Sequence, residues 1–190
     1  KGQQTFELDA IVFATGFDAM TGALREIDIR TSAGAALRDH WEGGPLTYLP
    51  HVQARLAADA NRPRAVRQAI GLLPKKDASG LDTVLDLPTR YLVRSAGLHG
   101  RSHYEMATLA LIRVAANDPE VAAGLLVERW ERDLPPELSA WAWAAAGKQA
   151  AQKLLPEAPK YFQRAAQLAL KHQGAIDWPD DTLAWKARAS

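Results

Sequence analysis

The 190-residue sequence has no cysteine, almost no net charge and no long apolar run. The absence of cysteine excludes disulfides, thiolate metal sites and cysteine nucleophiles. A formal net charge of +1 gives no global field to attract nucleic acid or an anionic membrane, so no nucleic-acid partner is expected. Because no apolar run approaches the ~20 residues that cross a bilayer, no membrane span is expected either. The start at Lys1, without methionine or a signal-type segment, suggests an internal or processed piece.

The composition indicates a globular protein with two parts of different character. Hydrophobic residues make up 47% and charged residues 24%, which is typical of a chain that buries an apolar core. Residues 1–49 have the composition of strands and loops, whereas alanine and leucine at helical spacing dominate residues 50–190. We therefore predict two domains, 1–49 and 50–190.

The first half contains a short run that is typical of a buried strand. Residues Ala10–Ala14 are apolar and lead directly into Thr15 and Gly16, a turn where backbone can approach a phosphate or a flavin. The alternative, an ordinary turn after a buried strand, is the commoner meaning of this pattern. Leu24–Arg30 alternates apolar and charged residues like a half-exposed strand, and Trp41–Leu49 predicts a turn and a short strand. The exposed edges of the first strand invite association, so this part is expected either to be poorly ordered or to pair with a hairpin made from Leu24–Arg30, with a homo-oligomer through the strand as one form of that pairing.

Residues 50–190 contain several residues that are typical of the first turn of a helix. They are Pro63, a capping box of Ser102 and Glu105, the N-cap Asp118 with Pro119, the pair Pro135-Pro136, the segment from Pro156 to Pro159, and Asp180 as a cap. Helices joined by such short connections should stack as antiparallel neighbours. The sequence thus predicts a mainly α fold, an α-solenoid of antiparallel helical hairpins stacked right-handed over residues 51–190, preceded by the strand and loop segment.

Several polar and aromatic groups of residues 50–190 are candidate sites. His99 and His103 beside Arg101 could form a metal pair, but no further ligands stand at suitable spacing, so surface polar residues are favoured and no metal is expected. Five tryptophans could stack on carbohydrate, although filling gaps between helices is favoured: Trp130, Trp141, Trp143, Trp178 and Trp185. A basic stretch is predicted to be a solvated helix face rather than a glycan or phosphate contact: Arg62, Arg64, Arg67, Lys75 and Lys76.

Two glutamates are candidate general acids. Glu105 is assigned to the capping box with Ser102, and Glu128 to a charged helix face. Neither is predicted to have the apolar surroundings that suit a general acid at neutral pH, so no catalytic residue is expected.

The stretch from Leu8 to Leu49 resembles the flavin-dependent Baeyer–Villiger monooxygenases. The similarity is carried by "LDAIVFATGFDAMTGALREIDIR" and "LRDHWEGGPLTYL", in which "ATGFD", Ala14–Asp18, matches a signature of the second half of that family. The resemblance implies that Thr15 and Gly16 approach FAD and NADP through backbone and that Asp18 ties the two cofactor domains together. It also implies a cytoplasmic location. No GxGxxG fingerprint and no counterpart of the family's catalytic arginine occur in the sequence, so no cofactor is expected in this chain alone.

The stretch from Pro50 to Ser190 resembles the U-shaped helical region of soluble lytic murein transglycosylases, which are periplasmic. The similar strings are "ANDP…A…L…W" and "DDTLAWKARA". The resemblance implies a scaffold that holds peptidoglycan glycan strands, or a partner protein, near a separate catalytic domain. The glutamate context of that catalytic domain does not occur in the sequence.

Three functions follow as hypotheses. The favoured one is a non-catalytic, peptidoglycan-associated scaffold of lytic transglycosylase type, fused to a monooxygenase fragment. The alternatives are a fragment of an FAD/NADP-dependent Baeyer–Villiger monooxygenase, and a chimeric product with no selected function. Under all three, we expect neither muramidase nor ketone-oxidising activity from the chain.

Overall fold

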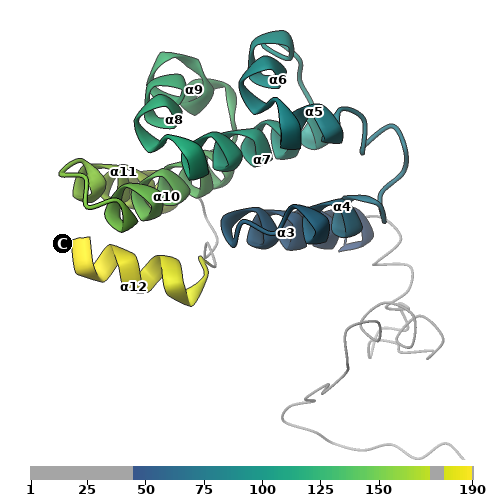
Figure 1. Cartoon of the computed structure of the whole chain (residues 1–190). Helices are drawn as coiled ribbons and strands as arrows, with labels where there is room; N and C mark the ends of the chain where they lie inside the picture. The colour runs from purple at the N-terminus through teal and green to yellow at the C-terminus, as the bar shows by residue number, and fades with distance from the viewer. Residues whose placement is uncertain (1–44, 172–177, 190) are drawn as a thin grey trace, which may run out of the picture. The chain divides into compact units, whose positions relative to one another are not determined.

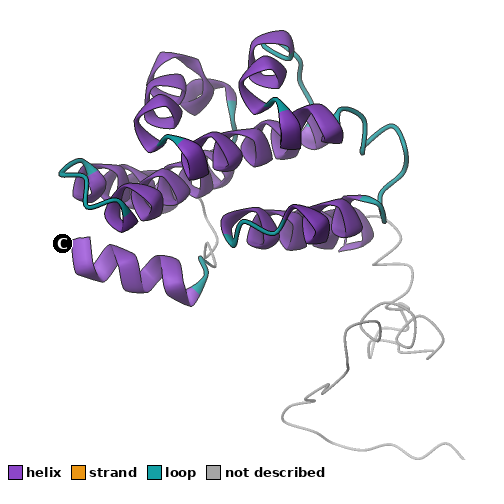
Figure 2. Cartoon of the chain, in the orientation of Figure 1, coloured by secondary structure: helices purple, strands orange, loops and turns teal. Residues whose placement is uncertain are grey.

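A computed structural model describes the backbone of residues 45–171 and 178–189, and side chains from Leu49 onward. Every regular element in these ranges is a helix, and the described residues contain no strand (Figure 2). The prediction of a mainly α fold is therefore confirmed. The predicted strands at Ala10–Ala14 and Leu24–Arg30 lie outside the described residues.

Two long helices, α7 and α10, run through the centre of the helical part (Figure 1). α7 packs against α5, α6, α8 and α10, while α10 packs in addition against α11 and α12. The elements are α3 (Pro45–Asp59), α4 (Pro63–Ile70), α5 (Leu81–Asp86), α6 (Pro88–Arg94), α7 (Arg101–Asn117), α8 (Pro119–Leu125), the π-helix η1 (Leu126–Trp130), α9 (Glu131–Asp133), α10 (Pro136–Gln152), α11 (Ala158–Lys171) and α12 (Asp180–Ala189). The arrangement around two central helices does not confirm the predicted solenoid of hairpins.

The chain divides into two units between Tyr48 and Leu49. All described side chains belong to the second unit, Leu49–Ser190. The assignment of residues 1–49 and 50–190 to two domains of different resemblance stays a prediction.

Prolines and one aspartate start several helices where the sequence predicts them. Pro63 and Pro136 occupy the first turns of α4 and α10, where the missing backbone N–H has no intrahelical partner to lose. Asp118 is the N-cap of α8: its carboxylate accepts hydrogen bonds from the backbone N–H groups of Glu120, at 3.0 Å, and Val121, at 3.1 Å. These starts confirm the local predictions.

Three local predictions are wrong. The expected short strand before Leu49 is instead the first turn of α3, which begins at Pro45 and continues through Pro50. The capping box does not form, because α7 already begins at Arg101, and Ser102 Oγ donates to Asp77 Oδ1 at 2.7 Å instead. Asp180 is the first residue of α12 and not the residue that precedes it.

Small residues allow the central helices to approach their neighbours closely. α10 contains eight alanines and glycines among its buried positions, together with the small residue Ser139: Ala140, Ala142, Ala144, Ala145, Ala146, Gly147, Ala150 and Ala151. At Gly147 a Cβ atom would lie 3.0 Å from the ring of Phe162 on α11, closer than two carbons pack. The tight α10–α11 contact therefore requires glycine at this position.

Replacing Gly147 by alanine is expected to destabilise the protein by about 1 kcal/mol. Forcing a methyl group into a packed contact costs about 1–3 kcal/mol, and the better helix propensity of alanine returns about 1 kcal/mol. Gly124 in α8 is the matched control, since a Cβ there meets no atom within 4 Å. Gly124→Ala should raise stability by up to about 1 kcal/mol. Urea unfolding of both variants measures the two effects, and equal shifts would contradict the packing explanation.

Candidate functional site

The cofactor-binding residues predicted from the sequence, Thr15, Gly16 and Asp18, lie outside the described residues. Their role stays a prediction. The candidate site that the structure does describe is a set of buried charged side chains between α3, α7, α10 and α12.

One face of α3 carries three buried polar side chains one helical turn apart. His51, Arg55 and Asp59 follow each other at a spacing of four residues, and their exposed fractions are 3%, 2% and 7%. Charged side chains are rarely buried unless they are paired. This face of α3 therefore requires partners on other helices.

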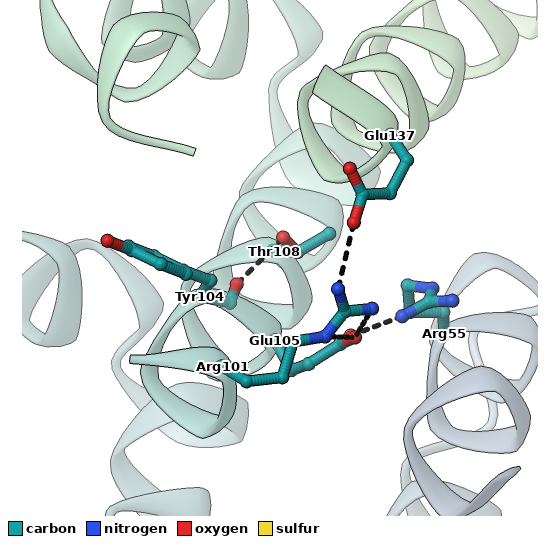
Figure 3. A network of polar contacts seen from close by, with 6 residues as sticks. All are labelled: Arg55, Arg101, Tyr104, Glu105, Thr108 and Glu137. Carbon is teal, nitrogen blue, oxygen red and sulfur yellow. Dashed lines mark hydrogen bonds and ion pairs between the residues drawn. The ribbon is translucent and has the colours of Figure 1, made fainter. Parts of the chain in front are cut away.

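Glu105 on α7 is the partner of Arg55, and its exposed fraction is 0% (Figure 3). Its Oε2 accepts a hydrogen bond from Arg55 Nη1, while its Oε1 accepts from Arg101 Nε at 3.0 Å and Arg101 Nη2 at 2.7 Å. Arg101 Nη1 donates in turn to Glu137 Oε1 on α10, at 2.8 Å. Two guanidinium groups and two carboxylates thus connect α3, α7 and α10 in one network.

The network favours a structural role for Glu105 over a catalytic one. A general acid must hold a proton and present it to a substrate, whereas both oxygens of Glu105 accept hydrogen bonds from cationic side chains. The Arg55 guanidinium also lies over the Trp141 ring, with 5.5 Å from Cζ to the ring centre. Glu128, the other glutamate that was weighed, is exposed on η1, as the prediction of a charged face requires.

Lys148 on α10 forms a second buried centre. Its exposed fraction is 2%, and its Nζ lies 2.7 Å from Asp59 Oδ2 on α3 and 2.7 Å from Asp181 Oδ2 on α12. Thr182 Oγ1 on α12 donates to the same Asp59 oxygen at 3.2 Å. Burial raises the pKa of Asp59 even though Lys148 opposes the shift. One ammonium group therefore joins three helices that are far apart in sequence.

The two histidines weighed as a metal pair make separate contacts. His99 is exposed and its Nδ1 lies 3.2 Å from the Tyr104 hydroxyl, whereas His103 is half-buried with its Nδ1 3.4 Å from the Tyr91 hydroxyl. Arg101 is engaged in the ion pairs described above. Within residues 45–171 and 178–189, no three metal-ligating side chains gather.

The aromatic and basic candidates are packing and surface residues. Trp130, Trp141 and Trp143 are buried, which confirms the prediction that they fill gaps between helices. Trp178 and Trp185 are half-buried beneath Lys186 and Arg188 respectively. The basic residues of the stretch are exposed, as a solvated face predicts: Arg62, Arg64, Arg67, Lys75 and Lys76.

Comparison with known proteins finds short similarities to monooxygenases. A stretch of 50 residues is 54% identical to the 2-oxo-Delta(3)-4,5,5-trimethylcyclopentenylacetyl-CoA monooxygenase of Pseudomonas putida, covering 26% of this chain and 9% of that protein. Stretches of 43 residues are 54% identical to the cyclopentanone 1,2-monooxygenase of a Comamonas species and 51% identical to a Baeyer–Villiger monooxygenase of Pseudooceanicola batsensis. Each covers 23% of this chain and 8% of the relative. The chain thus shares a short segment with Baeyer–Villiger monooxygenases and spans less than a tenth of their length.

The other comparisons identify no relative. No model of a protein family matches the chain, and no solved structure matches it. Nothing found supports the resemblance of residues 50–190 to murein transglycosylases. In the described part of the chain, no helix is both long enough and apolar enough to cross a membrane.

Proposed function

We propose that this chain carries a fragment of an FAD- and NADP-dependent Baeyer–Villiger monooxygenase, followed by a helical unit that serves as a non-catalytic scaffold. The observation that supports the first part is the short stretch of 51–54% identity to three monooxygenases. This makes the monooxygenase fragment, previously the alternative, the better-supported hypothesis. Thr15, Gly16 and Asp18 are the residues proposed to contact FAD and NADP within it.

The second part of the proposal rests on how the helical unit uses its charged groups. The carboxylates weighed as general acids are either tied to guanidinium groups, as Glu105 is, or exposed, as Glu128 is. The buried polar side chains of His51, Arg55, Asp59 and Lys148 face other helices and not solvent. Such groups stabilise a fixed arrangement of helices, which is the property of a scaffold.

A glycan-binding scaffold of murein transglycosylase type is a second candidate for this unit. Only the helical architecture of the described residues and the resemblance of "ANDP" and "DDTLAWKARA" favour it. Co-sedimentation of the chain with purified peptidoglycan tests it, and absence of binding would remove this candidate. If the chain is a chimeric product without a selected function, we expect it neither to bind peptidoglycan nor to support activity when its segment is transferred into a monooxygenase.

A segment exchange tests the monooxygenase proposal. Residues 8–49 would replace the matching segment of the Comamonas cyclopentanone 1,2-monooxygenase, to which 43 residues are 54% identical. We expect the hybrid to retain bound flavin and cyclopentanone-dependent NADPH oxidation, because the segment carries the "ATGFD" signature of that family. The same hybrid with Gly16→Val is the control and should lose flavin, since a branched side chain blocks backbone approach. A hybrid that folds but binds no flavin would overturn the proposal. The unmodified chain is expected to oxidise no ketone by itself.

A further inference from the structure

The face of α3 that packs on the helical unit combines small apolar residues with ionisable ones. Ala54 and Ala58 are buried to 2% exposure or less on this face, and His51, Arg55 and Asp59 lie beside them. The alanines contribute little apolar area, so the docking of α3 depends strongly on its polar contacts. Any change of charge on this face therefore acts on the position of the whole helix.

His51 is the residue of this face whose ordinary pKa lies nearest to neutral pH. Its Nδ1 is buried and has no hydrogen-bond partner. The charged groups close enough to act on its charge are Arg55 on α3, Arg101 and Glu105 on α7, and Asp77 in the connection between α4 and α5. Both facing carboxylates already accept hydrogen bonds, Glu105 from the two arginines and Asp77 from Ser102.

Protonated His51 would be a third cation in this environment. Burial lowers the pKa of His51 below its ordinary value, and this effect together with Arg55 and Arg101 outweighs the opposing effect of Glu105 and Asp77. A histidine with a lowered pKa contributes stability that is fully present above its unfolded pKa, near 6.5, and is lost as pH falls through its folded pKa. Acidification is therefore expected to weaken the docking of α3.

We propose that α3 is a pH-sensitive element, docked on α7 and α10 while the His51 imidazole is neutral and released when the imidazole takes up a proton. Release breaks the contacts of Arg55 with Glu105 and of Asp59 with Lys148, and leaves the α7–α10 pair in place.

Hydrogen exchange of the full chain at pH 7.5 and pH 5.5, corrected for the intrinsic exchange rates, tests this proposal. Amides of residues 51–59 should lose protection by up to about tenfold for each pH unit between the pKa of the released imidazole, near 6.5, and the lower pKa of the docked one, the limit for one proton, while amides of α10 stay protected. His51→Gln, which keeps a polar side chain without the titration, should abolish the loss. His103→Gln is the matched control and should leave it unchanged, although burial also lowers the pKa of His103.

Two further measurements separate the effect of His51 from that of Asp59 and cover the case of a His51 variant that does not fold. Asp59 lies on the same helix and is itself ionisable. Asp59→Asn weakens the contact with Lys148 at every pH, but a further loss of protection between pH 7.5 and pH 5.5 should remain if His51 causes it. If His51→Gln does not fold, an NMR titration of His51 in the unmodified chain should give the same midpoint as the loss of protection. A different midpoint, an unchanged α3 at pH 5.5, persistence of the loss in His51→Gln, or its abolition by His103→Gln would each overturn the proposal.

Discussion

Replacing Glu105 by glutamine should destabilise the helical unit by about 3–5 kcal/mol, the usual cost of removing one partner of a buried ion pair. The amide has nearly the same shape but no charge, so the Arg55 side chain, whose exposed fraction is 3%, loses a buried carboxylate partner. Arg101 is 45% exposed and can be hydrated instead. Urea unfolding followed by far-UV circular dichroism measures the change.

Glu128→Gln is the matched control for this experiment. Glu128 is exposed on η1, and surface substitutions of this kind usually change stability by less than about 0.5 kcal/mol. A loss below about 1 kcal/mol for Glu105→Gln, or equal losses for both variants, would contradict the structural role of Glu105.

Replacing Lys148 by methionine should cost a similar amount, about 3–5 kcal/mol. Methionine fills much of the same space but leaves the Asp59 carboxylate buried without its cation, and it removes the ion pair to Asp181 on α12. We therefore expect lower stability together with faster hydrogen exchange in α12. Since burial already raises the pKa of Asp59, this carboxyl group should take up a proton more readily in the variant.

Lys160→Met provides the control for this lysine. Lys160 is exposed on α11, and its replacement should leave stability and exchange in α12 unchanged. The double variant Lys148→Met, Asp59→Leu should recover much of the loss, since it removes the unpaired charge as well. If Lys148→Met alone unfolds no earlier than the unmodified chain, Lys148 does not hold the three helices together.

The helices were predictable because their signals are local. Pro63, Asp118 and Pro136 act on backbone groups within the same turn, so a short window of sequence contains all the information they carry. The prediction of a capping box was wrong because of another local contact. Arg101, four residues before Glu105, lies on the same helical face and binds its carboxylate, so Glu105 does not reach back to cap the helix.

The buried network was not predictable, because its partners are distant in sequence. Arg55 and Glu105 are 50 residues apart, and Asp59 and Lys148 are 89 apart. A signal did exist in α3, where His51, Arg55 and Asp59 recur at a spacing of four on a helix with alanines at 54 and 58. Such a stripe is also compatible with a solvated face, and only the packing of α3 on other helices distinguishes the two.

The independence of the helical unit from the residues before it is tested most directly by comparing the full chain with residues 45–190. The truncation should start at Pro45 rather than after residue 49, because α3 begins there. The described contacts that hold Leu49–Ser190 together lie within that unit, so both proteins should show helical circular dichroism and free energies of unfolding within about 1 kcal/mol, a small difference beside a typical total of about 5–15 kcal/mol. A truncated protein that is unfolded, or several kcal/mol less stable, would contradict the division into two parts.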